Sequence, residues 1–197
     1  MRILKNIIFI ISLISILFIV TSFIIQMNLK KEKNISLGEK DLSKVILIDF
    51  NNNPIKASDL LKNPSVFFFG FTNCPDICPL TLTKLSITLQ KIKDDKNLII
   101  YFVSLDSERD KPEILKNYLQ SFKEEVIGLT GSEYNLKKFA DYLNIKYYKR
   151  KIKDSYTIDH TSSSVLIFKG KVYDKILFDD DLNVSVKKIN NFLSHIN

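Results

Sequence analysis

The sequence has few of the residues that most often cross-link a chain or bind metals. Its 197 residues include two cysteines, two histidines and two methionines, and tryptophan is absent. Two cysteines are too few for a small disulfide-stapled scaffold. Hydrophobic residues make up 45% and charged residues 26%, which is typical of a globular protein and excludes a disordered or collagen-like chain. The net charge of +7 is moderate and does not by itself select nucleic acid, a membrane or an acidic protein as partner.

Charged residues are missing from a long N-terminal stretch between Lys5 and Lys30. Within it, residues 7–25 form an apolar run, and a helix of this length, at ~1.5 Å per residue, spans roughly the hydrocarbon thickness of a bilayer. We therefore expect residues 1–29 to hold a cytoplasmic stub and an uncleaved transmembrane anchor, followed by a polar tether at residues 30–43. The alternative is a cleaved signal peptide, with Val20 and Ser22 as small residues before the cleavage point.

The compartment is predicted from the same segment. Lysines flank the apolar run on both sides, so the positive-inside rule gives no clear orientation. The run begins too early to follow a long transit peptide, which favours a bacterial membrane protein. We expect a single pass through the bacterial inner (cytoplasmic) membrane, with the globular domain facing the periplasm.

From residue 44 onwards, apolar runs alternate with amphipathic stretches, which predicts one α/β domain over residues 44–197. The apolar run at 65–71 is typical of a strand buried on both faces. Asp110 with Glu113 predicts a capped helix start, and Gly170 predicts a hairpin. Expected strands cover residues 45–50, 65–71, 98–105, 126–129, 164–168 and 172–178, and expected helices cover residues 79–92, 110–122, 132–143 and 182–193. This order implies a central sheet with helices on both faces.

The two cysteines form a short motif between a predicted buried strand and a predicted helix. Cys74 and Cys78 each precede a proline, and a residue before proline is disfavoured in the helical conformation. We therefore expect a constrained turn, with the helix starting at Pro79. Both sulfurs would then lie near a helix N-terminus, which favours thiolate, the form that binds soft metals or attacks disulfides. A purely structural disulfide is a weaker alternative, because so short a loop removes little unfolded-state entropy.

The other candidate ligands are few. Met1 and Met27 both lie in the predicted anchor region, so a blue-copper site with an axial methionine is disfavoured. A structural zinc site would need a fourth ligand, whereas two thiolates and one imidazole suit Cu(I). His195 lies near the C-terminus and is expected to be solvated. His160 lies in an expected loop before a hydrophobic strand.

Four segments together resemble the successive signatures of the Sco/SenC family: GFTNCPDICPLTL, LDSERDKPEILKNYLQSF, VIGLTG and YTIDHTSSSVLIF. The resemblance covers about residues 44–178. Members of this family are membrane-anchored, thioredoxin-like copper proteins that assist assembly of the CuA centre in cytochrome c oxidase subunit II. The resemblance thus implies a thioredoxin-like central sheet flanked by helices, with that subunit as partner.

Site residues follow from the same resemblance. It implies that Cys74, Cys78 and His160 bind copper, and that Asp159 orients or tunes the imidazole. Asp106 also matches the family pattern. Thioredoxin-like enzymes place a cis-proline opposite their cysteines, but no proline follows Pro112 here, so another residue must face the sulfurs.

The sequence departs from its relatives in places, and it leaves more than one function open. Asn73 stands where many relatives carry histidine, and residues 106–110 read DSERD rather than the frequent DPxRD; neither change removes a ligand. The main alternative to a metallochaperone is a thiol–disulfide oxidoreductase that uses the cysteines as its redox pair and reduces the acceptor's cysteines before metallation. A peroxidase would need a supporting arginine, and neither Arg109 nor Arg150 is placed by an adjacent motif.

No nucleic-acid partner is expected. The basic stretch at residues 146–153, KYYKRKIK, is rich in lysine and tyrosine. We interpret it as an exposed loop or a docking face for an acidic partner.

Overall fold

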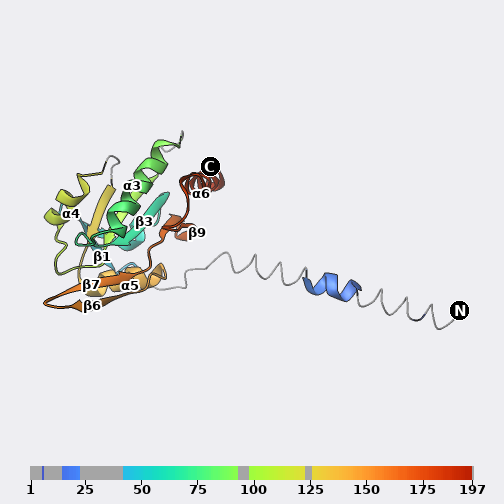
Figure 1. Cartoon of the computed structure of the whole chain (residues 1–197), viewed down its shortest axis with the longest axis horizontal. Coiled ribbons are helices and arrows are strands. Elements are labelled where there is room, and N and C mark those ends of the chain that lie inside the picture. Colours follow the sequence, from blue (N-terminus) through green and yellow to red (C-terminus); the bar gives the residue numbers. More distant parts are fainter. Residues whose placement is uncertain (1–5, 7–14, 23–41, 93–97, 123–125, 197) are drawn as a thin grey trace. The chain divides into compact units, whose positions relative to one another are not determined.

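The computed structural model describes residues 6, 15–22, 42–92, 98–122 and 126–196, and it divides into two compact units, Met1–Ile35 and Ser36–Asn197 (Figure 1). In the first unit, residues 15–22 are helical, and most of the predicted anchor lies outside the described residues. Within the described ranges, no helix has both the length and the apolar character needed to cross a membrane. The anchor therefore stays a prediction.

The second unit is built on a seven-stranded sheet in the order β2-β1-β5-β4-β3-β8-β9. Its central strands β3, β4 and β5 are parallel, while β1, β2, β8 and β9 pair antiparallel with their neighbours. The strands are β1 (Ile46–Asp49), β2 (Pro54–Lys56), β3 (Ser65–Gly70), β4 (Ile99–Ser104), β5 (Val126–Thr130), β8 (Ser164–Phe168) and β9 (Lys171–Ile176). The predicted central sheet is confirmed, and the short strand β2 was not predicted.

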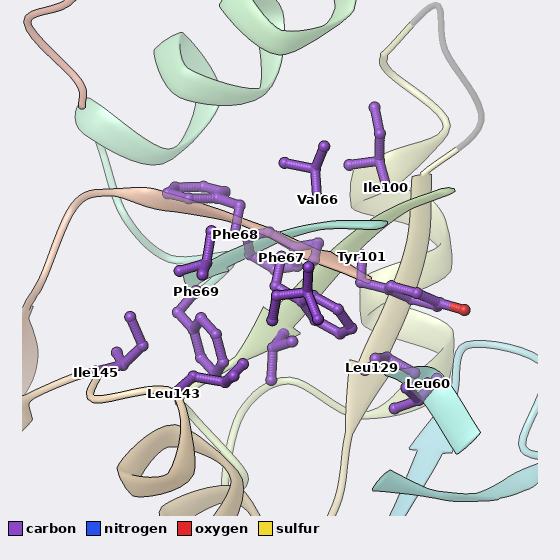
Figure 2. Packing of buried hydrophobic residues seen from close by; sticks show 14 of the residues in the cluster. Leu60, Val66, Phe67, Phe68, Phe69, Ile100, Tyr101, Leu129, Leu143 and Ile145 are labelled. Carbon is purple, nitrogen blue, oxygen red and sulfur yellow. The ribbon is translucent and has the colours of Figure 1, made fainter. Parts of the chain in front are cut away.

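Helices cover both faces of this sheet, and the side chains of β3 are buried on both of these faces. Successive side chains of a strand point to opposite faces, and every residue of β3 is buried, as predicted. Figure 2 shows Phe68 on one side of the strand and Phe67 and Phe69 on the other. Phe67 and Phe69 contact the helical residue Phe139, whereas Phe68 contacts Phe102 of the neighbouring strand, whose ring contacts the helical residue Tyr118. The helices are α2 (Ala57–Leu60), α3 (Ile77–Gln90), α4 (Pro112–Leu119), α5 (Glu133–Tyr142) and α6 (Leu182–Ile196).

A separate two-stranded sheet, β6 (Tyr147–Ile152) paired with β7 (Ser155–His160), was not predicted. Figure 1 shows this hairpin as a long arm of the domain. Five of the six residues of β6 are exposed, so the strand lacks the apolar alternation by which a half-buried strand is recognised. The expected loop at residues 146–153 is therefore mostly strand, and His160 ends β7 instead of lying in a loop.

Two predicted helix starts also differ from the structure. Helix α3 begins at Ile77, two residues before Pro79, because a proline in the first helical turn removes an N–H that would have no intrahelical partner. Helix α4 begins at Pro112 after Lys111, without a side-chain cap. Asp110 does not cap it, because its carboxylate is buried and accepts hydrogen bonds from Thr72 and Ser104.

The sheet topology brings three segments together at the end of the sheet where β3 and β4 terminate. Parallel strands β3 and β4 end side by side, where the Leu105 N–H donates to Gly70 O at 2.8 Å. The cysteine segment follows β3, and the loop 105–111 follows β4. Strand β8 runs antiparallel to β3, so it begins at this same end, four residues after His160. Segments far apart in sequence are thereby placed around the thiols.

Candidate metal and thiol site

The two cysteines occupy different environments at the start of α3. Cys78 lies in the first helical turn and its side chain is fully buried, whereas Cys74 lies in the preceding turn and is partly exposed. Both are free thiols. The backbone N–H of Cys74 donates to Phe71 O at 3.2 Å, which closes the turn that the two prolines were expected to constrain.

A hydrogen bond between the two sulfurs gives the two thiols very different pKa values. Donation from the Cys78 thiol to Cys74 is the largest effect that lowers the pKa of Cys74, to about 5. The same hydrogen bond, together with burial, raises the pKa of Cys78 far above its ordinary value. Proximity to a helix N-terminus predicted thiolate at both positions. In the structure only the more exposed sulfur favours thiolate, because the buried one keeps the shared proton.

His160 faces the buried thiol from the end of β7. Its Nε2 lies 3.9 Å from Cys78 Sγ, and its Nδ1 lies 2.9 Å from Thr161 O. A carbonyl oxygen only accepts hydrogen bonds, so Nδ1 carries the proton and the lone pair of the neutral ring is on Nε2. The ring also packs edge-on against Phe71, with centroids 6.2 Å apart. The histidine is thus held in the tautomer that can bind a metal through Nε2.

Asp159 lies beside His160 in sequence, but its side chain has a different partner. Adjacent residues of a strand point to opposite faces, and Asp159 forms an ion pair with Arg150 across the hairpin, with Nε–Oδ2 at 2.7 Å. The contact that fixes the ring comes from Thr161 O. Any influence of Asp159 on the imidazole is therefore one of charge rather than of a hydrogen bond that orients it.

The other predicted histidine lies elsewhere. His195 is in the last turn of α6, is exposed as expected, and its Nδ1 is 2.5 Å from Asn191 O. It serves as a natural control for experiments on His160.

Beneath the cysteine turn, two fully buried carboxylates anchor the loop after β4. Asp110 accepts hydrogen bonds from Thr72 N and Thr72 Oγ1, at 2.9 and 2.6 Å, and from Ser104 Oγ at 2.6 Å. Asp106 accepts from Arg109 Nε and, at 2.7 Å, from the Tyr156 hydroxyl. Asp110 thus ties the loop to the cysteine turn, and Asp106 ties it to the hairpin.

The sequence suggested Arg109 only as a possible peroxidase residue, and its place in this cluster was not predicted. Its guanidinium lies 3.9 Å from the ring centroid of Tyr156 and 5.9 Å from that of Phe71. The three-residue spacing from Asp106 is a weak signal for the ion pair. Nothing local in the sequence points to Tyr156, which lies 47 residues further on.

The donor atoms suit a soft cation. In the ranges that the structure describes, no three His, Cys, Asp or Glu side chains are grouped so as to hold a metal ion as they stand. The 3.9 Å between Cys78 Sγ and His160 Nε2 is nevertheless close to the separation across a shared trigonal ion, about 3.7 Å for bonds of about 2.3 Å to sulfur and 2.0 Å to nitrogen. The hydrogen bond between the sulfurs places Cys74 beside this pair.

The central sheet with helices on both faces, and a cysteine turn between a central parallel strand and a helix, define a thioredoxin-like fold. The chain belongs to the SCO1/SenC family, whose model matches residues 42–194. The resemblance noted in the sequence is therefore confirmed.

Relatives and solved structures agree with this assignment. The SCO2-like protein of Rickettsia typhi is 34% identical over 201 aligned positions, covering 96% of this chain and 98% of the relative. Yeast Sco1 with copper bound has a TM-score of 0.68 at 30% identity, covering 76% of this chain and 86% of that one. Arabidopsis thaliana ScoI with copper bound has a TM-score of 0.70 at 26% identity, covering 79% of this chain and 99% of that one.

Proposed function

We propose that this protein is a copper metallochaperone that holds Cu(I) through Cys74, Cys78 and His160 and delivers it to the CuA centre of cytochrome c oxidase subunit II. The observation that carries the proposal is the approach of His160 Nε2 to the buried thiol of Cys78 at 3.9 Å, with the opposite ring nitrogen held by Thr161 O. Two sulfurs and one imidazole are a donor set that favours Cu(I) over harder ions. Copper bound to yeast Sco1 and to Arabidopsis ScoI supports the choice of metal.

The acceptor and the location belong to the same proposal. Assembly of the CuA centre is what the family resemblance implies, and that centre is itself a copper site that must be filled by delivery. We propose that residues 7–25 anchor the chain in the bacterial inner membrane, so that the domain from residue 44 onwards faces the periplasm. Matches to Rickettsia proteins over nearly the whole chain support a bacterial setting.

Copper stoichiometry tests the ligand set. The full chain, with reduced thiols and under anaerobic conditions, is loaded with Cu(I) and challenged with a competing chelator. We expect about one copper retained per chain, lost in Cys74→Ala/Cys78→Ala and strongly weakened in His160→Ala. This variant removes one of three donors, and even the loss of a group that only supports a ligand typically costs 10- to 100-fold in affinity. His195→Ala, the matched control, should behave as wild type. Unchanged affinity in His160→Ala would exclude the assigned ligand.

A second function is favoured by the different acidities of the two thiols. A partly exposed Cys74 with a pKa of about 5 beside a buried, protonated Cys78 is the arrangement of an attacking and a resolving thiol. Cys74 thiolate would attack an acceptor disulfide and release one acceptor thiolate. Cys78, giving its proton to that leaving thiolate, would then attack the Cys74 sulfur. This attack releases the second acceptor thiolate, which takes a proton from water, so the acceptor leaves as a dithiol and this chain is oxidised to a disulfide.

Variants of His160 and of Cys78 distinguish the two functions. Thiol–disulfide exchange needs both sulfurs but not the imidazole, so His160→Ala should retain most of the exchange rate while losing copper. A Cys78→Ser variant should accumulate a mixed disulfide with an acceptor peptide, detectable by mass spectrometry. Chains that exchange readily but retain no copper would make the oxidoreductase the primary function.

A further inference from the structure

His160 is carried by a hairpin that is a separate sheet, and side chains fix this hairpin near the thiols. Along β7, residues Tyr156, Ile158 and His160 share one face, because side chains alternate along a strand. Ile158 is buried on this inner face. Arg150 and Asp159, which pair with each other, lie on the opposite face. The position of His160 therefore depends on what holds the inner face.

Arg109 makes the contacts that reach across this junction. Its Nε pairs with the buried Asp106 of its own loop, and its Nη1 donates to Tyr156 O at 3.2 Å. The guanidinium also stacks on the Tyr156 ring at 3.9 Å, and the Tyr156 hydroxyl donates to Asp106 at 2.7 Å. A planar group with a fixed fork of donors can bind a carboxylate and a carbonyl while lying on a ring, which an ammonium group cannot.

A second contact links the same arginine to the histidine through the cysteine turn. The Arg109 guanidinium lies 5.9 Å from the centroid of Phe71, and the Phe71 ring packs edge-on against His160. Phe71 also belongs to the turn that presents Cys74, since its carbonyl accepts the Cys74 N–H. Arg109 therefore contacts both the hairpin that carries the imidazole and the aromatic ring on which the imidazole rests.

We propose that Arg109 is a positioning residue for His160: clamped by Asp106, it fixes Tyr156 and Phe71 and so sets the imidazole in reach of the thiols. This inference rests on the proposed copper site, and it gives a role to an arginine that touches neither sulfur. It predicts that losing Arg109 weakens copper retention only through His160.

A double-mutant cycle on the full chain tests this. Cu(I) affinity is measured by chelator competition for wild type, Arg109→Met, His160→Ala and the double variant. We expect Arg109→Met to lower affinity about tenfold, the lower end of the effect of groups that orient a ligand, and to change it less than twofold in the His160→Ala background. An equal loss in both backgrounds, or no loss in either, would overturn the proposal.

Conservative and matched variants separate geometry from charge. Arg109→Lys keeps the charge but not the fork, so it should not restore wild-type affinity; full restoration would contradict positioning by the guanidinium. Arg150→Met removes an arginine from the outer face of the same hairpin. It unpairs Asp159 but breaks none of the Arg109 contacts described above, so it should change affinity much less than Arg109→Met. If Arg109→Met fails to fold by far-UV circular dichroism, Arg109→Lys carries the test.

A metal-free measurement keeps this proposal separate from the copper proposal. The chain has two histidines, so a ¹⁵N long-range correlation spectrum shows two imidazoles, and His195→Gln assigns them. In wild type His160 should show one tautomer, protonated at Nδ1. In Arg109→Lys it should show averaged tautomers, whereas an unchanged His160 signal would refute the positioning role even if copper binding fails in every variant.

Discussion

Gly70 and Cys78 are so close that a Cβ atom added to Gly70 would lie 2.8 Å from the Cys78 sulfur. The same atom would lie 2.9 Å from the ring of Phe102. Glycine at the end of β3 is therefore required by space, since the buried thiol and a core aromatic ring occupy the volume that any side chain would need.

Gly70→Ala should displace the Cys78 sulfur or the Phe102 ring. Overpacking of this kind lowers the free energy of unfolding by about 1–3 kcal/mol, and we expect copper affinity to fall with it. Urea denaturation and chelator competition measure the two effects. Gly131→Ala is the matched control, because its added Cβ meets nothing nearer than 3.4 Å. Equal stability of the two variants would show that the thiol has room to move.

Alkylation of the reduced protein should report the low pKa of Cys74. Because its hydrogen bond from Cys78 lowers that pKa to about 5, Cys74 is thiolate at neutral pH. The iodoacetamide rate should be level between about pH 7 and 9 and should fall as the pH drops through 5. An ordinary cysteine, with a pKa of about 8.5, would still be gaining rate between pH 7 and 9.

Removing the donor gives the control for that measurement. In Cys78→Ala no thiol donates to Cys74, so the pKa of Cys74 should rise and the rate profile should shift to higher pH. Mass spectrometry of the modified peptide identifies the sulfur that has reacted. A wild-type rate that keeps rising above pH 7 would contradict the hydrogen-bonded thiolate.

Ser104→Ala should destabilise the loop beneath the site. Ser104 Oγ donates to Asp110 and accepts the Asp106 N–H at 2.9 Å, so its removal takes this acceptor from the buried Asp106 N–H and leaves the Asp110 carboxylate only its hydrogen bonds from Thr72. We expect a loss of about 1–3 kcal/mol in the free energy of unfolding. Ser164→Ala is the control: that hydroxyl is equally buried but has no hydrogen-bond partner within the described part of the chain, so the variant should be neutral or slightly more stable.

Phe139→Ala should test the packing of α5 on the sheet. The ring contacts both Phe67 and Phe69, and truncating a fully buried phenylalanine typically lowers stability by about 3–5 kcal/mol. Thermal and urea unfolding measure this loss. Tyr134→Ala on the same helix, where the side chain is exposed, should change stability by no more than about 0.5 kcal/mol. A small effect at Phe139 would mean that α5 contributes little to the core.

The sheet and the thiol motif were predictable because their signals are local. The run of phenylalanines in β3 fits burial on both faces, and the helix α5 starts after Ser132 as expected, with Ser132 Oγ accepting the Asn135 N–H. The prolines beside Cys74 and Cys78 indicated a constrained turn. In each case the residues that determine the structure are neighbours in sequence.

The hairpin was not predictable, because its stability is tertiary. Strand β6 is almost entirely exposed, and the hairpin is held through Tyr156 and Ile158 rather than through a local apolar pattern. The shared proton of the cysteines and the place of Arg109 likewise depend on distances between segments. The sequence shows which side chains are present, but the pKa values of the thiols and the contacts of Arg109 depend on burial and hydrogen bonding in the folded chain.

The β6–β7 hairpin is a sheet separate from the main one, so the imidazole is carried by a different sheet from the one that precedes the cysteine turn. The two sulfurs lie in the turn after β3 and in the first turn of α3, whereas His160 ends β7. Tyr148, Arg150 and Ile152, on the outward face of the hairpin, take part in no rung of the main sheet. Substitutions at these three positions should therefore leave the strand register beneath the dithiol unchanged.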